Sequence, residues 1–164
     1  MTHVVQTLVT RLAFPEGPRW HDGRLWFSDI HGLEISATDL GGRREVIGTI
    51  AASPSGLGWT ADGKLLVVSM NDRKLLRQEA AGFVVHADLA PFANGPCNDM
   101  VVDAAGRAYV GNFGFDMWAG APRAPASILR VDPDGTVAIA ANNLEFPNGM
   151  VVTPNGKNLI VAES

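Results

Sequence analysis

Three oxygen-bearing side chains recur at one position of a repeated sequence pattern. Glu16, Asn98 and Asn148 each stand seven or eight residues before a turn glycine, and Ser55 holds the same place in a further copy of the pattern. One carboxylate and two amide carbonyls make an all-oxygen set, which suits Ca²⁺, Mg²⁺ or Mn²⁺ better than a metal that prefers thiolate or imidazole. The pattern therefore predicts a divalent-cation site, provided that the fold brings these positions together.

Each of these residues also has a simpler interpretation. An Asn-Gly pair such as Asn148-Gly149 is, taken alone, more often a turn than a ligand, and Glu16 alone is typical of a surface carboxylate. The shared position in the repeat is what favours the metal site, and Ser55 leaves room there for substrate or water. A proline directly before each position, or two residues before it, fixes φ and keeps the incoming chain extended: Pro15, Pro54, Pro96 and Pro147.

The elements that must position these residues are four copies of a strand, a turn and a strand. The turns centre on Asp22-Gly23, Asp62-Gly63, Ala105-Gly106 and Asn155-Gly156, and Asp-Gly and Asn-Gly pairs tolerate the positive φ of a tight hairpin. Short strands rich in β-branched, aromatic and other apolar residues follow each turn: 25–27, 65–68, 108–110 and 159–162. Two more strand candidates follow each of the first three hairpins, at 33–38 and 45–48, 74–77 and 83–86, and 127–131 and 137–140.

A repeat of four strands indicates a β-propeller. The turn glycines are 40, 43 and 50 residues apart, and four-stranded propeller blades recur about every 40–50 residues. We predict an all-β chain in which residues 1–164 form a single partial propeller domain of about three and a half blades. The expected blades span about 14–50, 54–90 and 96–142, and a fourth starts at about 146–164.

Propeller geometry explains how distant residues would meet. The first strand of every blade is the innermost, so equivalent positions at its start converge at one end of the central channel. Because a propeller removes its sheet edges by closing into a ring, we expect residues that follow Ser164, or a second chain, to complete it. The longest interval between turn glycines comes from an insertion at 113–125, which we expect to lie over the same end of the channel.

The inner-strand motifs carry a family resemblance that spans essentially the whole chain. Residues 14–20 (FPEGPRW), 54–59 (PSGLGW), 97–107 (CNDMVVDAAGR) and 146–152 (FPNGMVV) resemble, in order, those of the SMP-30/gluconolactonase/luciferin-regenerating family. The resemblance implies a six-bladed propeller with one catalytic divalent cation at the top of the central channel. Glu16 and Asn148 match metal ligands of the family, and Asn98 matches a residue that binds the metal or its substrate.

This resemblance implies a metal-dependent hydrolase that acts on a small-molecule sugar lactone or related ester. Ca²⁺ is the expected cofactor, with Mg²⁺, Mn²⁺ or Zn²⁺ as alternatives. The family pattern also has an aspartate, both a ligand and the general base, on a later blade, so we expect no catalytic residue before Ser164. Pro96 stands where some members carry an arginine, and the sugar-lactone recognition of those members is therefore not carried over.

The insertion offers two further substrate-binding candidates. Asp116 matches a place where the family can present an acid to the substrate, and Trp118 would form a wall of the pocket. The alternative is a solvated loop in which Trp118 packs against its own blade. His31 follows a second strand on the same face, although a lone loop histidine is more often simply exposed. Three other tryptophans are expected in the blade cores: Trp20, Trp26 and Trp59.

A different class of function fits the same repeat. In a non-catalytic propeller of the NHL or WD40-like kind, which acts as a binding module, the residues at the repeated position would only form turns. Such modules need no cation, so metal binding separates the two hypotheses.

Composition argues against two classes of binding partner. The 164 residues are 46% hydrophobic and 18% charged, the balance of a chain that can bury a core, and the formal net charge is −4. Without a Lys/Arg cluster we expect neither nucleic acid nor an anionic membrane as a partner, and no apolar stretch reaches the roughly 18 residues of a membrane span. The single Cys97, expected to be a buried inert thiol, and the polar N-terminal residues favour a cytoplasmic location.

Overall fold

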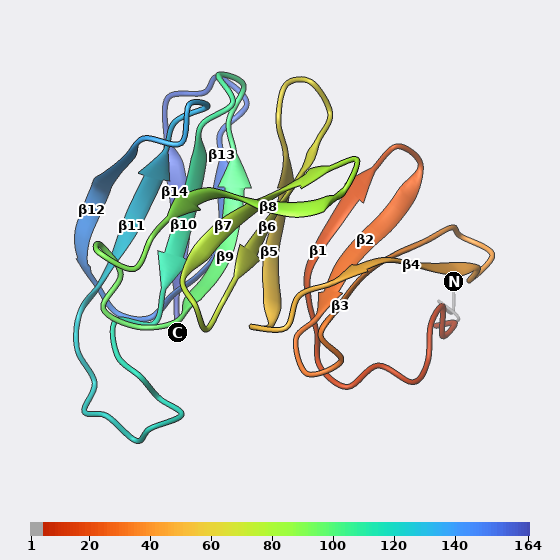
Figure 1. Ribbon diagram of the computed structural model, residues 1–164, viewed down its shortest axis with the longest axis horizontal. Coiled ribbons are helices and arrows are strands. Elements are labelled where there is room, and N and C mark those ends of the chain that lie inside the picture. The colour runs from red at the N-terminus through yellow and green to blue at the C-terminus, as the bar shows by residue number, and fades with distance from the viewer. Residues whose placement is uncertain (1–4) are drawn as a thin grey trace.

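The computed structural model describes residues 5–164. All regular secondary structure in this range is β-strand, and the strands pair antiparallel. Three sheets have four strands each and lie side by side (Figure 1). The first sheet contains β1 (Pro15–His21), β2 (Arg24–Asp29), β3 (Glu34–Thr38) and β4 (Arg44–Thr49). The second contains β5 (Pro54–Trp59), β6 (Leu65–Ser69), β7 (Lys74–Glu79) and β8 (Gly82–Asp88). The third contains β9 (Cys97–Val102), β10 (Ala108–Asn112), β11 (Ala126–Val131) and β12 (Val137–Leu144).

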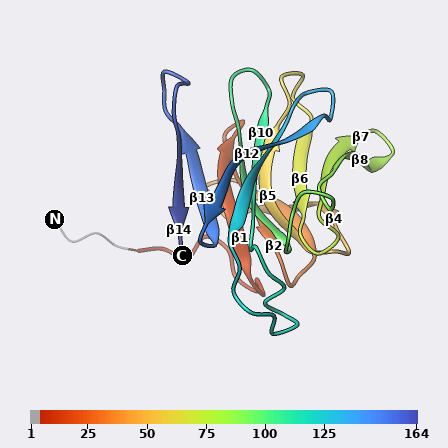
Figure 2. The same cartoon turned by 90° about the vertical axis from the view of Figure 1, so that its left-hand side faces the viewer.

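A fourth sheet has two strands, β13 (Pro147–Val152) and β14 (Leu159–Glu163). In each sheet the strands follow one another in chain order, which is the simple up-and-down pattern of a propeller blade. Figure 2 shows the sheets from the side, with β13 and β14 forming one outer layer of the stack. The predicted all-β class is confirmed for the described residues. Within residues 5–164, no helix is long and apolar enough to cross a membrane.

Two kinds of turn join the first and second strands. Asp22 and Gly23 both have positive φ, 48° and 72°, as the two-residue hairpin prediction requires. In the other three hairpins only the glycine has positive φ, and its N–H donates to a carbonyl three residues earlier, as in the 2.9 Å bond from Gly63 N to Thr60 O. These longer loops fit a type I turn followed by a left-handed glycine. The sequence pattern placed the turns correctly but did not distinguish the two types.

The first strand of every sheet carries one extra residue at the same place. The register with the second strand shifts between Glu16 and Arg19 in β1, between Pro54 and Leu57 in β5, and equivalently in β9 and β13. A bulge locally bends a strand and re-aims its side chains, and bulges are frequent beside functional sites. The repeated position that carries Glu16, Ser55, Asn98 and Asn148 is thus an irregular point of each strand.

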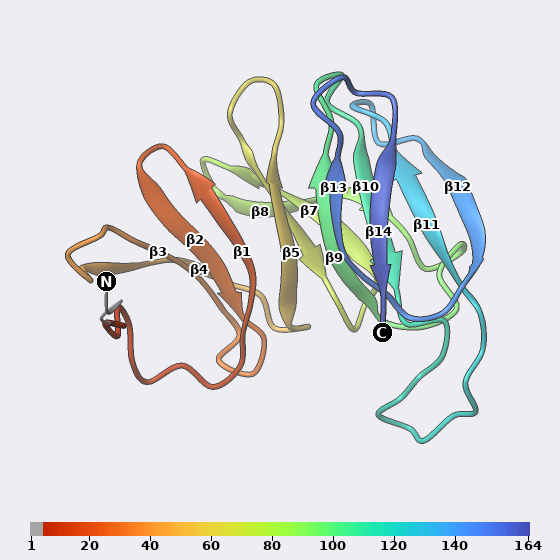
Figure 3. The ribbon, with the colours of Figure 1, turned by 180° about the vertical axis from the view of Figure 1, so that it is seen from behind.

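First strands are also the strands through which the sheets meet. β5 contacts both β1 and β9, and β9 contacts β13, so that these four strands lie side by side (Figure 3). Gly56 makes this approach possible, because a Cβ atom there would lie 2.5 Å from the backbone nitrogen of Met100. The chain passes too close to tolerate any side chain at that point.

Apolar clusters fill the spaces between neighbouring sheets. Leu57, Leu65 and Trp26 belong to a cluster between the first and second sheets, and Leu75, Met100 and Val110 to one between the second and third. Each fully buried large aliphatic side chain stabilises the fold by about 1.5–3 kcal/mol relative to an exposed one. The core therefore fixes how the sheets are arranged, and with it the spacing of the first strands.

The tryptophan predictions are confirmed in part. Trp26 is buried, and Trp59 packs on it and stacks on His21 at 3.8 Å between ring centroids. Trp20 contradicts its prediction, because it is 58% exposed. Trp59 faces the first sheet, whereas Trp20, at the equivalent position, faces the side of the first sheet on which no other described sheet packs.

Candidate metal and substrate site

The three predicted ligands line one cavity. Glu16 from β1, Asn98 from β9 and Asn148 from β13 border a hollow of about 220 Å³ at the end where the first strands begin. Trp118, from the loop between β10 and β11, borders the same hollow. The fold thus gathers side chains that are separated by up to 132 positions in the sequence. Whether they bind a metal stays a prediction.

A chain of weak hydrogen bonds links the amide groups. Ser55 Oγ donates to Asn98 Oδ1 at 3.3 Å, and Asn98 Nδ2 donates to Asn148 Oδ1 at 3.4 Å. Asn148 Nδ2 in turn donates to Ser164 Oγ at 3.2 Å. Ser55 and Asn98 are buried, so these contacts hold the amides in place, and their length leaves the oxygens free to take a stronger partner.

Glu16 brings the negative charge of the site. Its carboxylate accepts one long hydrogen bond, 3.4 Å from the N–H of Gly17, and forms no ion pair with any residue that the structure describes. A partly buried carboxylate without a cationic partner is a strong attractor for a cation. Its exposure to the cavity leaves its oxygens accessible.

The chemistry of this donor set fits a hard divalent cation. One carboxylate, two amide oxygens and a nearby hydroxyl are all oxygen donors, as Ca²⁺ prefers, and Ca²⁺ takes six to eight of them. Three protein ligands would leave several positions for water and substrate. Among residues 5–164 no group of three His, Cys, Asp or Glu side chains could hold a metal ion, so a zinc-type cluster is not formed there.

The cavity has an apolar lining at repeat-equivalent positions. Ile30, Met70 and Phe113 each directly follow the second strand of a sheet, and together with Phe146 they form a small hydrophobic cluster. The rings of Phe113 and Phe146 stack at 4.4 Å. Phe146 reaches this position with a φ of +50°, which is strained for a bulky side chain and is often found at functional sites.

Asp29 was missed by sequence reasoning, although it supports the site. Its two carboxylate oxygens accept from the backbone N–H groups of Ala13, Phe14 and Gly32, at 2.8, 2.7 and 3.1 Å. Burial raises the pKa of this carboxyl group, but these three donors outweigh burial and lower it below its ordinary value. The signal in the sequence is that Asp29 is the last residue of the second strand of its sheet. Glu163 ends the second strand of the fourth sheet, and it likewise accepts from a backbone N–H, that of Glu145, shortly before Asn148.

The two substrate-binding candidates of the insertion, Asp116 and Trp118, border different sets of hollows. Residues 113–125 connect β10 to β11 and extend from the end of the molecule that holds the cavity (Figure 3). Trp118 is 58% exposed and lies edge-on to His31 of the first sheet at 6.3 Å, so it does not pack against its own sheet. Asp116 does not border the cavity of the three ligands. It borders an adjacent hollow, and its Oδ1 accepts from the backbone N–H groups of Trp118 and Ala119.

Cys97, beside Asn98, is not a nucleophile. The thiol is fully buried, and burial raises its pKa to about 12, so that it stays protonated at neutral pH. The predicted burial of this thiol is confirmed.

Comparison with known proteins decides the family. Residues 14–164 match the model of the SMP-30/Gluconolactonase/LRE-like region. The chain belongs to this family. The resemblance seen in the four inner-strand motifs is thereby confirmed.

Three relatives illustrate the likeness. The chain is 27% identical to pentonolactonase XacC of Haloferax volcanii over 98% of its own length and 53% of that protein. It superposes on the gluconolactonase XC5397 of Xanthomonas campestris with a TM-score of 0.78 and 24% identity, over 96% of this chain and 57% of that one. Regucalcin of Agrobacterium tumefaciens, described as a calcium-binding protein, gives 0.74 and 24%, over 94% and 52%. The chain spans about half the length of these relatives, and the two structures share its fold.

Proposed function

We propose that this family member contributes the metal-binding half of a divalent-metal-dependent lactonase. The observation that carries the proposal is that three repeat-equivalent oxygen side chains, Glu16, Asn98 and Asn148, border one cavity. The pentonolactonase and gluconolactonase relatives support a lactone as the substrate, and the calcium-binding relative supports Ca²⁺ as the ion.

The complete propeller is proposed to have six blades, to which this chain contributes three and a half. Both outer faces of the stack support a continued ring. Trp20 is 58% exposed on one outer face, and Val151 and Ile160, a cross-strand pair on the other, are 55% and 57% exposed. Exposed apolar faces of this kind are typical of surfaces that pack against another element.

The residues of this chain have distinct parts in the proposed reaction. A cation held by Glu16, Asn98 and Asn148 would polarise the lactone carbonyl and stabilise its developing negative charge. Ser55 donates to Asn98 Oδ1 and so orients that amide. Trp118 and Phe146 border the cavity and limit the access of bulk water to the substrate. We expect the carboxylate that accepts the proton of the attacking water to lie on a later blade, after Ser164.

The proposal is tested by lactone hydrolysis in the complete enzyme. Chelation is expected to abolish turnover of γ- and δ-lactones, and added Ca²⁺ to restore it. Asn148→Ala should weaken the activation by Ca²⁺ at least tenfold, whereas Asn155→Ala, which removes an amide from the β13–β14 turn, should not. Turnover that is insensitive to chelation would refute the metal-dependent mechanism. If no lactone is hydrolysed and Ca²⁺, Mn²⁺ and Mg²⁺ leave the melting temperature unchanged, the binding-module hypothesis is favoured.

A further inference from the structure

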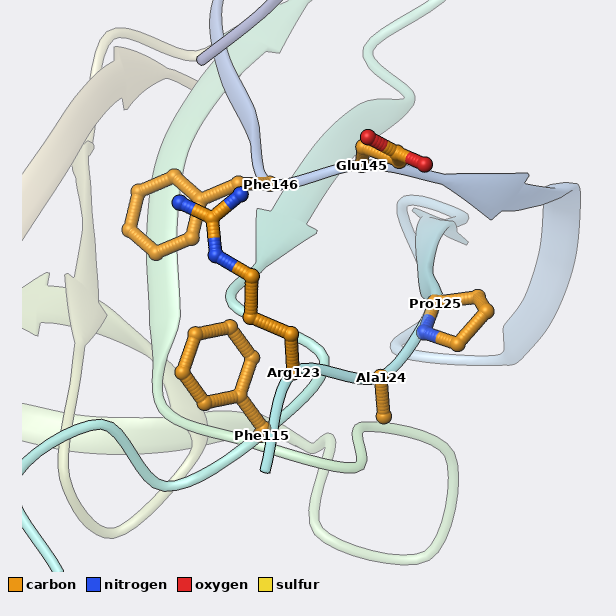
Figure 4. A pocket seen from close by; sticks show the side chains of 6 residues that line it. All are labelled: Phe115, Arg123, Ala124, Pro125, Glu145 and Phe146. Carbon is orange, nitrogen blue, oxygen red and sulfur yellow. The ribbon is translucent and has the colours of Figure 1, made fainter. Parts of the chain in front are cut away.

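A second cavity adjoins the candidate metal site and contains an arginine whose side chain has no ion-pair or hydrogen-bond partner among residues 5–164. Phe115, Arg123, Ala124, Pro125, Glu145 and Phe146 line this hollow of about 140 Å³ (Figure 4). Phe146 also borders the cavity of Glu16, Asn98 and Asn148, so the two hollows share this residue in their linings. The second hollow is therefore a neighbouring place for a substituent of a ligand that occupies the first.

The Arg123 guanidinium is free to bind a ligand. Nine of the twelve other Arg and Lys side chains each lie within ion-pair distance of a carboxylate. Arg123 forms no such pair and no side-chain hydrogen bond with residues 5–164. Glu145 is the acidic residue of the lining, and Figure 4 shows its carboxylate turned away from the guanidinium, which extends toward the ring of Phe146.

The two ends of the insertion pack closely together and fix the backbone near Arg123, although the side chain of Arg123 is exposed. Gly114 lies against the other end of the loop so closely that a Cβ there would be 2.3 Å from the carbonyl oxygen of Ala124. Asn112 Oδ1 accepts from the N–H of Gly114 at 2.9 Å, and Gly95 packs just as tightly against the backbone of Phe115. The backbone of Arg123 therefore lies at the closely packed end of the loop, on the chain segment opposite Phe115 (Figure 4).

We propose that Arg123, between Phe115 and Phe146, binds a carboxylate carried by the substrate, so that the enzyme prefers lactones with an acidic substituent. A guanidinium presents paired N–H donors that match the two oxygens of a carboxylate, and Phe115 and Phe146 line the same hollow as apolar walls. This inference rests on the proposed lactonase function and specifies the substrate class of the same site. Arg123 lies away from the three candidate ligands and would therefore act in recognition.

The test compares one lactone in two forms with the complete enzyme. The substrates are 5-oxotetrahydrofuran-2-carboxylate and its uncharged carboxamide, which have the same shape. Arg123→Gln is expected to lower kcat/KM for the carboxylate about 10- to 100-fold, the range of a lost charged hydrogen bond, and to change it less than about twofold for the carboxamide. Arg123→Lys should retain part of the preference. Lys157→Gln, which removes a charge from the β13–β14 turn, is the matched control and should change neither.

The outcomes separate this inference from the proposed function. Equal losses for the two substrates, or no loss for either, would overturn the carboxylate site while leaving the lactonase proposal intact. If the unmodified enzyme hydrolyses other lactones but neither of these two, the preference for an acidic substituent is refuted and the lactonase proposal stands. If it hydrolyses no lactone at all, the lactonase proposal fails, and calorimetric binding of the carboxylate becomes the readout. Binding that is weakened at least tenfold by Arg123→Gln would still support the anion site, and binding that is absent or unaffected would refute it.

Discussion

Arg19 on β1 and Asp99 on β9 form an ion pair, although the two residues lie on strands that are not neighbours. The strand between them is β5 (Figure 3). Arg19 Nη2 lies 2.7 Å from Asp99 Oδ1 and also donates to the carbonyl oxygen of Met100 at 2.6 Å. Asp99 directly follows Asn98 at the bulge of β9. The pair therefore ties together the strands that carry Glu16 and Asn98, and it fixes the point of β9 at which Asn98 turns into the cavity.

Removing the cationic partner of this pair should be costly. Arg19→Gln leaves the Asp99 carboxylate, whose side chain is 14% exposed, without its counter-charge. A buried charge left unpaired typically lowers the free energy of unfolding by about 3 kcal/mol or more. Lys74→Gln, which breaks an exposed pair with Asp72, should lower it by less than about 1 kcal/mol. Urea denaturation at pH 7 measures both, and equal effects would contradict a special role for the buried pair.

The same variant should respond to pH in a defined direction. Burial raises the pKa of Asp99 above its ordinary 3.8, and Arg19 partly opposes that rise. Between pH 3.8 and the raised pKa, the folded protein therefore binds more protons at Asp99 than the unfolded chain does. The contribution of Asp99 to stability consequently falls as the pH rises through this range. Without Arg19 the pKa rises further. The destabilisation by Arg19→Gln should therefore be greatest at pH 7 and shrink toward pH 4, and a constant difference across this range would argue against it.

Asp29 is expected to act on the site through the backbone. Asp29→Asn leaves one oxygen to accept from the N–H groups of Ala13, Phe14 and Gly32, and should lower the free energy of unfolding by about 1–3 kcal/mol. Because the pKa of Asp29 is lowered, its stabilisation is present above the ordinary 3.8 and is lost as the pH falls through the lowered value. The variant should consequently lose less stability than the unmodified protein when both are acidified. An unchanged acid profile would contradict this assignment.

Trp118 should affect substrate binding more than folding. Its ring is 58% exposed and contacts His31 across the cavity mouth, so Trp118→Ala is expected to change the free energy of unfolding by less than about 1 kcal/mol. Loss of an aromatic wall should raise KM several-fold and leave kcat nearly unchanged, as expected when ground-state and transition-state binding weaken together. Steady-state kinetics of lactone hydrolysis would show this, and a fall in kcat alone would be inconsistent with a wall.

Local sequence signals predicted the strands and hairpins well because turn glycines and alternating apolar residues act over a few positions. The β-class and the family follow from them. Trp20 shows the limit of such reasoning, since its burial depends on whether another sheet packs on its face and its sequence context resembles that of Trp59. The bulges could likewise not be predicted from the sequence, because an extra residue in one strand can be recognised only when the pairing register with the partner strand is known.

Residues of the candidate site could be grouped from the sequence where the repeat supplied an alignment, and could not be grouped elsewhere. Glu16, Asn98 and Asn148 could be grouped because they hold one position of the repeat, and the structure places them on one cavity. The pair of Arg19 and Asp99 joins residues 80 positions apart that hold different places in their repeats, so no pattern connects them. Arg123 could not be singled out from the sequence, because it shares a hollow with Phe146 only in the folded chain.

Calorimetric titration of Ca²⁺ into the complete enzyme and its Glu16→Gln variant tests the shared cation site most directly. The substitution removes the only carboxylate among the three candidate ligands and keeps its size. We predict a single site whose dissociation constant rises at least tenfold in Glu16→Gln and stays within twofold in Glu45→Gln, a control on the outer strand β4. Unchanged Ca²⁺ affinity in Glu16→Gln would contradict the proposal that these side chains hold one ion.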